Sequence, residues 1–184
     1  MKSSRNASPL FFIAMLILIL GSCRGPSHLG ERVNEPFSGS KYQSNNRFFR
    51  AVGKGESQRD NIARGRADME AKTLLAGQVE TNMRNVSDDY IAQTQNLDGS
   101  DVAEKFQSLS RQVINTRIAD LRKIGEEKYY NGEQYTVFIA YEIRKNAMFR
   151  FMKKQARTDK SIDAQTLKAI EEILDAQIAA SEGD

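Results

Sequence analysis

The sequence has few of the side chains on which most active sites and disulfide scaffolds depend. Its 184 residues include one cysteine, one histidine and no tryptophan. The lone cysteine, Cys23, cannot form a disulfide within the chain, so packing has to hold the core together. The lone histidine, His28, lies among Gly, Pro and Ser residues that give it no rigid neighbours. These shortages argue against Ser-His-Asp or Cys-His catalysis, and no metal site is predicted.

Long apolar runs are scarce as well. Residues 10–20 form an unbroken apolar stretch of eleven, preceded by Lys2 and Arg5 and by no acidic residue. A positively charged start, a short apolar stretch and small residues after it are typical of a secretory signal peptide. The stretch is shorter than the roughly 20 residues of a membrane-spanning helix, and nothing after residue 23 is predicted to span a membrane.

The apolar stretch ends in Leu20-Gly21-Ser22-Cys23, which resembles the lipobox of bacterial lipoproteins. The resemblance implies cleavage between Ser22 and Cys23 and a covalent lipid on Cys23; no other cofactor is predicted. Two or three acyl chains would be enough for stable attachment to a membrane. An ordinary signal peptide with an incidental cysteine and an uncleaved anchor are the alternatives.

Arg24 occupies the position after the cysteine, where an Asp would favour retention in the inner membrane. The resemblance to lipoprotein signals therefore implies the outer membrane, with the protein facing the periplasm. The cell surface and the inner membrane are the other options.

Cleavage before Cys23 would leave 184 − 22 = 162 residues, enough for one modest domain. It would also remove Lys2 and Arg5, leaving 27 − 2 = 25 basic residues against 24 acidic ones, a net charge of +1. Such a balance gives no reason to expect nucleic acid as a partner. Residues 23–46 are rich in Gly, Pro, Ser and Asn, which predicts a flexible tether behind the lipidated cysteine.

The domain is predicted to begin with a strand and a helix. Residues 47–53 read as the strand, and Gly53-Lys54-Gly55 is predicted to turn the chain into the helix. The helix covers about residues 58–79 and carries a stripe of small residues that would let it lie close on a sheet: Ala63, Ala67 and Ala71. After residue 79 the pattern predicts either a continued helix or a helix with a break.

The second half of the chain predicts a β-hairpin between helices. Its arms are residues 118–130 and 134–144, joined by Asn131-Gly132 as a type I′ turn. Both faces of the second arm are apolar, which predicts a central strand. One helix is predicted before the hairpin, with Val102, Phe106, Leu109 and Val113 on one face. Two follow it, one around residues 148–152 and one over residues 165–180 with Leu167, Ile170, Leu174 and Ile178 on one face.

The predicted fold class is α+β. A small antiparallel sheet of about three strands, including the C-terminal hairpin 118–144, packs against the Ala-rich helix, with further helices at the C-terminus. The predicted organisation is a signal peptide (1–22), a lipidated cysteine with its tether (23–46), an α+β domain (47–157) and a C-terminal helix and tail (158–184).

Three segments carry a resemblance to a known family. Arg50-Ala51-Val52-Gly53, residues 62–67 and residues 134–140 resemble the LPP-twenty family of small bacterial lipoproteins. The resemblance covers roughly residues 47–144 and the lipobox. It implies a helix packed on a small antiparallel sheet, as in flagellar accessory lipoproteins that form rings at the outer membrane. Other members are outer-membrane or surface antigens. The segment between residues 79 and 102 and the C-terminal tail depart from the family pattern.

The predicted function is that of a non-enzymatic, lipid-anchored cell-envelope protein with a structural or interaction role. Its partners would be the membrane, through the acyl chains, and other envelope proteins or further copies of the chain. Two alternatives are a module that binds an anionic envelope polymer or lipid headgroups, and a periplasmic enzyme that uses carboxylates. Enzymatic use of adjacent acids is disfavoured because neighbouring side chains diverge on strands and helices. The acidic doublets are Asp88-Asp89, Glu126-Glu127 and Glu171-Glu172.

Charge is segregated near the C-terminus. Residues 144–160 contain seven basic residues and one acid, whereas residues 161–184 contain six acids and one base. The basic part would contribute to binding an anionic surface, and its candidate contacts are Arg150, Lys153, Lys154 and Arg157. In a second interpretation the acidic helix folds back on the basic one. In a third, the apolar stripe of the acidic helix meets another copy of the protein.

Overall fold

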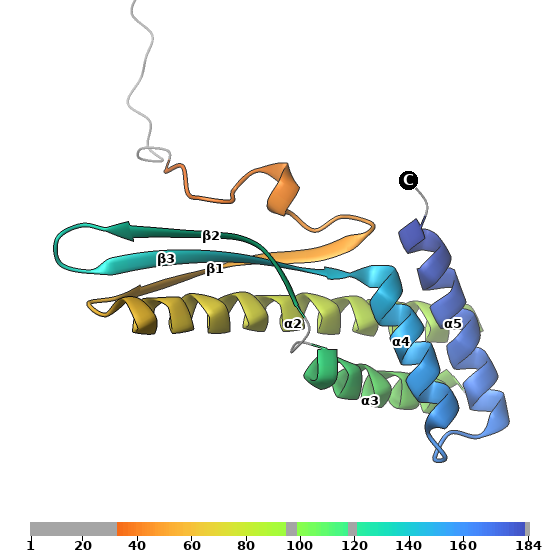
Figure 1. Ribbon diagram of the computed structural model, residues 1–184. Coiled ribbons are helices and arrows are strands. Elements are labelled where there is room, and N and C mark those ends of the chain that lie inside the picture. Colours follow the sequence, from red (N-terminus) through yellow and green to blue (C-terminus); the bar gives the residue numbers. More distant parts are fainter. Residues whose placement is uncertain (1–32, 95–98, 118–120, 183–184) are drawn as a thin grey trace, which may run out of the picture. The chain divides into compact units, whose positions relative to one another are not determined.

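The computed structural model describes residues 33–94, 99–117 and 121–182 (Figure 1). The predicted signal peptide, the lipidation site at Cys23 and the first part of the tether lie outside the described residues. Residues Glu35–Asp184 belong to one compact unit. Among the described residues, no helix combines the length and the apolar character needed to cross a membrane.

The fold is α+β, as predicted. Three antiparallel strands form one sheet in the order β1-β3-β2: β1 (Phe48–Ser57), β2 (Arg122–Tyr130) and β3 (Tyr135–Arg144). The helix α2 (Asp60–Thr94) runs along one face of this sheet (Figure 1). The second hairpin arm is the central strand, which confirms the prediction made from its two apolar faces.

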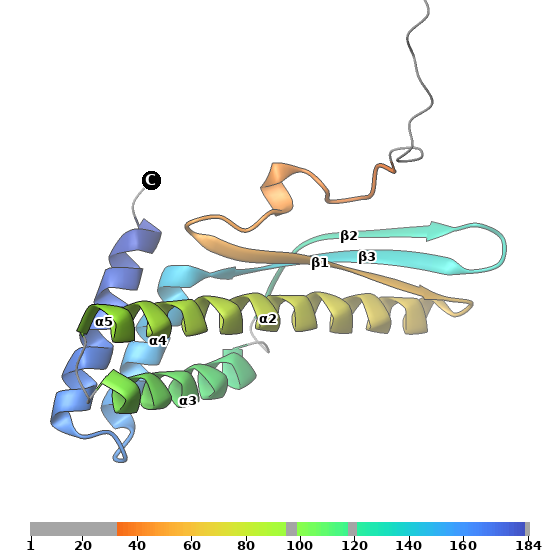
Figure 2. The same cartoon turned by 180° about the vertical axis from the view of Figure 1, so that it is seen from behind.

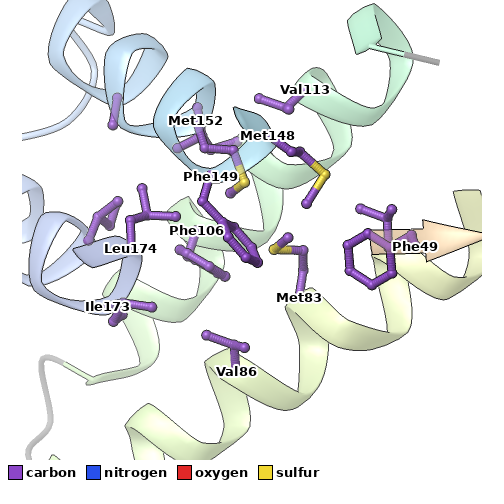
Figure 3. Packing of buried hydrophobic residues seen from close by; sticks show 14 of the residues in the cluster. Phe49, Met83, Val86, Phe106, Val113, Met148, Phe149, Met152, Ile173 and Leu174 are labelled. Atoms are coloured by element: carbon purple, nitrogen blue, oxygen red, sulfur yellow. The ribbon is translucent and has the colours of Figure 1, made fainter. Parts of the chain in front are cut away.

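Three further helices gather around the end of α2 that extends beyond the sheet (Figures 1 and 2). They are α3 (Gly99–Arg117), α4 (Lys145–Thr158) and α5 (Ala164–Glu182). Their apolar faces meet that of α2 in one core (Figure 3), to which the four helices contribute Met83 and Val86, Phe106 and Val113, Met148, Phe149 and Met152, and Ile173 and Leu174. The four residues predicted to share one face of α3 are all buried: Val102, Phe106, Leu109 and Val113.

The predicted turn at Gly53-Lys54-Gly55 is wrong, because these residues lie within β1 where it packs against α2. The strand runs straight through both glycines. A Cβ atom at Gly53 would lie 2.2 Å from the carbonyl oxygen of Ala67, and one at Gly55 would lie 2.0 Å from that of Ala63. Both glycines therefore serve the close approach of strand and helix, in which the alanine stripe is the other partner.

The helix α2 continues without a break through the region where the sequence was ambiguous. Val79, Met83 and Val86 extend its buried face beyond the sheet and into the core formed with the other helices. The first part of α2 packs on the sheet and the second part packs on the other helices, so one face is buried along the whole helix. This packing stabilises a continuous helix rather than one with a break.

Residues 35–46 are part of the compact unit, although the sequence predicted a flexible tether there. The rings of Phe37 and Tyr42 pack with centroids 4.8 Å apart. A Cβ atom at Gly125 of β2 would lie 2.6 Å from the Phe37 ring, so this ring rests directly on the sheet. The amide of Arg50 donates to Ser44 Oγ at 2.8 Å. These contacts fix a segment whose composition resembles that of a linker.

The predicted hairpin is confirmed, but its type I′ turn is not. The strands are joined by residues 131–134, and among the described residues only Gly132 and Phe37 have a positive φ. Asn131 therefore lacks the positive φ that a type I′ turn requires. Its side-chain oxygen instead accepts from the amides of Glu133 at 3.0 Å and Gln134 at 2.9 Å.

Gly132→Val is expected to lower the free energy of unfolding by about 1–3 kcal/mol. Gly132 has a φ of +95°, which is a strained conformation for a β-branched side chain, and no atom within 4 Å would add a clash. Gly132→Asn is the control, since Asn tolerates positive φ better than Val. Urea unfolding of the full chain measures both. Equal losses for Val and Asn would contradict the conformational explanation.

Candidate functional site

The basic residues predicted to contact an anionic surface lie on α4, and most of them are already paired with α5. Lys153 Nζ lies 2.7 Å from Asp175 and Arg157 Nε 2.5 Å from Glu171, and Arg150 pairs with Glu182. Lys154 is exposed and has no ion pair within the described part of the chain. The structure thus has the arrangement in which the acidic helix folds back on the basic one.

The apolar stripe of α5 packs inside the chain. Ile170 and Leu174 are fully buried, and Leu167 and Ile178 are partly buried against the same core. The boundary predicted at 157/158 therefore falls within a compact unit, at the end of α4, which packs on α5. This stripe is not available to another copy of the protein while α5 stays in place.

Members of two of the predicted acidic doublets are held in ion pairs. Glu126 lies 3.0 Å from Arg64 and Glu171 is paired with Arg157, while Asp88 and Asp89 are exposed on α2. Among the described residues, no group of three or more His, Cys, Asp or Glu side chains could hold a metal ion.

A half-buried titratable pair lies between α2 and the sheet. The Tyr141 hydroxyl donates to Asp68 Oδ1 at 2.6 Å. Burial raises the pKa of Tyr141 to about 12, and the hydrogen bond to Asp68 acts in the same direction. Asp68 also accepts from Lys72 at 2.7 Å. Each of these three side chains is hydrogen-bonded to another member of the network, and the network joins α2 to the sheet.

Figure 1 shows β3 running into α4. A different group of cations gathers near this junction. Strand register explains one row of it: Arg50 on β1 and Arg122 on β2 both lie opposite Glu142 on the central strand β3. In the next row, Phe48 of β1 lies opposite Arg144 of β3. Because direct cross-strand partners share a face, these side chains all lie on the face of the sheet that α2 does not cover. We refer to Arg47, Phe48, Arg50, Arg122, Glu142 and Arg144 as the arginine site.

One carboxylate serves two guanidinium groups in the arginine site. Glu142 Oε2 lies 3.0 Å from Arg50 Nε, and Oε1 lies 3.5 Å from Arg122 Nε. The side chains of Glu142 and Arg50 are 8% and 12% exposed, whereas that of Arg122 is 74% exposed. Arg50 also donates to the carbonyl of Gln43 at 3.1 Å. The Arg50–Glu142 pair is therefore enclosed, while Arg122 presents most of its guanidinium group to solvent.

Phe48 lies between two guanidinium groups. Its ring centroid is 4.6 Å from Arg50 Cζ and 5.8 Å from Arg144 Cζ, both within the range of cation–π attraction. The neighbouring cation Lys145 belongs to the other side of the strand, where its ammonium lies 4.5 Å from the Phe49 ring centroid. Burial lowers the pKa of Lys145. Lys145 is therefore not part of the arginine site.

The arginine site borders two hollows. One of about 340 Å³ is lined by Phe48, Arg122, Glu142 and Arg144 together with the first turn of α4, where Ala147 and Met148 lie. The other, of about 270 Å³, is also lined by Phe48 and Arg144, together with Arg47, Ser181 and Glu182. Together they provide polar and apolar walls beside exposed positive charge, an arrangement that can bind an anion.

Sequence reasoning missed this site because its members come from three separate segments. Arg50, Arg122 and Arg144 lie in three different strands, and Arg47 comes directly before the first of them. No spacing along the chain relates the three segments. Only the register of β2 and β3 brings Arg122 opposite Glu142. The polar residues Arg50 and Glu142 within strands that were otherwise apolar were the one available signal.

No protein-family model, curated protein or solved structure matches the chain. The resemblance to the LPP-twenty family therefore rests on the three quoted segments and the lipobox, and function has to be argued from the residues of this chain.

Proposed function

We propose that the protein is a non-enzymatic lipoprotein of the cell envelope whose folded domain acts by binding other envelope components. The observation that carries the proposal is the sequence Leu20-Gly21-Ser22-Cys23 at the end of an apolar stretch of signal-peptide length. The compact unit begins at Glu35, which is 35 − 23 = 12 positions after the cysteine. Twelve residues of chain span at most about 40 Å, so a lipid on Cys23 would keep the domain near the membrane.

The proposed location is the outer membrane, with the domain in the periplasm. Arg24 after the cysteine and the resemblance to the LPP-twenty family support this location. The cell surface and the inner membrane are the other possible destinations of a lipoprotein.

Cys23→Ala is expected to abolish lipidation and signal cleavage, and with them the lipid attachment to the membrane. Each buried methylene of an acyl chain contributes about 0.8 kcal/mol, so two or three chains hold the protein stably on the membrane. A variant without acyl chains loses this attachment. The measurement is cell fractionation with mass spectrometry of the N-terminal peptide. Ser22→Ala is the matched control, since it keeps a small residue before the cysteine and should still be lipidated.

Two results would contradict lipidation of Cys23. One is a wild-type N-terminal peptide that starts at another residue or carries an unmodified Cys23. The other is a Cys23→Ala protein that is still cut after residue 22 and still found with the membrane.

A second candidate function is supported by the arginine site: binding of an anionic envelope polymer or of lipid headgroups. Two of its four arginines, Arg50 and Arg122, pair with Glu142, and the site adjoins a half-apolar hollow. A carboxylate-based enzyme has less support, because Glu126 and Glu171 are held in ion pairs with Arg64 and Arg157.

A further inference from the structure

We propose that the arginine site binds a phosphate group carried by a partly apolar molecule, held by the guanidinium groups of Arg122 and Arg144 beside the Phe48 ring. This inference deepens the second candidate function, and it does not depend on lipidation of Cys23.

The charge of the site favours a phosphate group over a single carboxylate. Four arginines against Glu142 give a formal charge of 4 − 1 = +3. Glu182, which borders the second hollow, is paired with Arg150. A carboxylate brings one negative charge, whereas a phosphate monoester brings about −1.5 to −2 at neutral pH. The more highly charged group relieves more of the repulsion among the guanidinium groups.

The geometry separates residues that contact the ligand from residues that position them. Arg50 donates to Glu142 and to the carbonyl of Gln43, and its side chain is only 12% exposed, so little of it is open to a ligand. Arg122 Nε lies 3.5 Å from Glu142 Oε1, and the Arg122 side chain is 74% exposed. Arg144 lies against the Phe48 ring and borders both hollows. Arg122 and Arg144 thus offer two guanidinium forks of the kind that bind phosphate oxygens in pairs.

The hollow is larger than a phosphate group requires. Its volume is about 340 Å³, and Phe48, Ile143, Ala147 and Met148 provide apolar walls beside the two arginines. A bare phosphate ion would leave these walls in contact with water. A phosphate ester with a short apolar body would cover them, and burial of apolar surface adds to the affinity.

The cations of α4 provide a matched comparison. Three of the four residues of α4 predicted to contact an anionic surface are paired with acids of α5. The fourth, Lys154, is exposed. Lys160 is exposed as well, close to the end of α4. Removing Lys154 and Lys160 lowers the net charge by the same amount as removing Arg122 and Arg144, but leaves the arginine site intact.

The test measures binding of dihexanoyl phosphatidate, a soluble phosphate monoester with short acyl chains, to the full chain in a neutral detergent by calorimetry. Arg122→Gln/Arg144→Gln is expected to weaken binding by about tenfold or more, since two charge-assisted contacts are lost. Lys154→Gln/Lys160→Gln is expected to change the affinity by less than about twofold, because exposed distant charges are screened. Far-UV circular dichroism and melting temperature should match the wild type in both variants. Arg122→Lys, which keeps the charge and loses the fork, should fall between wild type and the double variant.

Three results would overturn the proposal: no binding to the wild-type chain, equal weakening by the two double variants, or dicarboxylic succinate binding as tightly as the phosphate ester. Two further arms distinguish the source of the phosphate. Displacement of the probe by phosphatidylglycerol mixed into the micelle supports a lipid headgroup. Displacement by inorganic pyrophosphate, with no effect of the lipid, supports a soluble phosphate compound.

Discussion

Gly53→Ala and Gly55→Ala are each expected to destabilise the protein severely, by about 3 kcal/mol or more. The added methyl group would lie 2.2 Å from the carbonyl oxygen of Ala67 in the first case and 2.0 Å from that of Ala63 in the second. The obstacle is helix backbone, which has no alternative rotamer. The variants can fold only if α2 moves away from β1, and that movement opens the close packing between the β1 glycines and the α2 backbone.

Two other glycines provide matched controls for this prediction. Gly65 and Gly77 lie within α2, and a Cβ atom at either would meet nothing within 4 Å. Gly65→Ala and Gly77→Ala should therefore stabilise the helix by up to about 1 kcal/mol. Denaturant unfolding of all four variants measures the difference. Similar unfolding midpoints for the two β1 variants and the two α2 variants would show that β1 and α2 leave room for a methyl group.

Leu174→Ala is expected to cost about 2–5 kcal/mol of the free energy of unfolding. Leu174 is 0% exposed and lies in the core where α5 meets the other helices (Figure 3). Removing three carbon atoms there leaves a cavity among side chains that cannot fully collapse. The expected loss is a large part of the stability of an ordinary domain, about 5–15 kcal/mol in total.

The neighbouring residue tests whether ion pairs hold α5 instead. Asp175 pairs with Lys153 at 2.7 Å but is 58% exposed, so Asp175→Asn should cost only about 0–1 kcal/mol. Urea unfolding at low and at high salt measures both variants. A loss for Asp175→Asn as large as that for Leu174→Ala, and abolished by salt, would mean that charge rather than packing keeps α5 in place.

The periodic patterns of the sequence predicted most of the elements and their buried faces. The four apolar residues of α3 are spaced so that any helix would place them on one side, and they are buried. The alanine stripe of α2 likewise predicts a sheet contact, and Ala63 and Ala67 are buried against β3. Such predictions succeed because helix and strand periods depend only on residues a few positions apart.

Glycine is where the local pattern failed. Gly53-Lys54-Gly55 has the composition of a turn, yet the same residues are required where a strand lies against helix backbone. The choice depends on Ala67, 67 − 53 = 14 positions after Gly53, and on Ala63, 63 − 55 = 8 positions after Gly55, both on another element. Residues 35–46 failed for a related reason. Their composition is typical of a linker, but it includes two aromatic residues, Phe37 and Tyr42, whose rings pack together. The Phe37 ring packs on Gly125 of β2, a contact that requires the folded sheet.

The sequence by itself determined the class of the fold, the faces of its helices, its central strand and the lipobox on which the proposed anchoring rests. The tertiary structure alone decided which charges are paired. It placed the acids of α5 on the cations of α4, and it aligned Arg50 with Glu142, 92 residues away in the chain. Charge along a chain can be counted, but pairing depends on distance in space, and distances between separate segments are set only when the strands take their register and the helices pack.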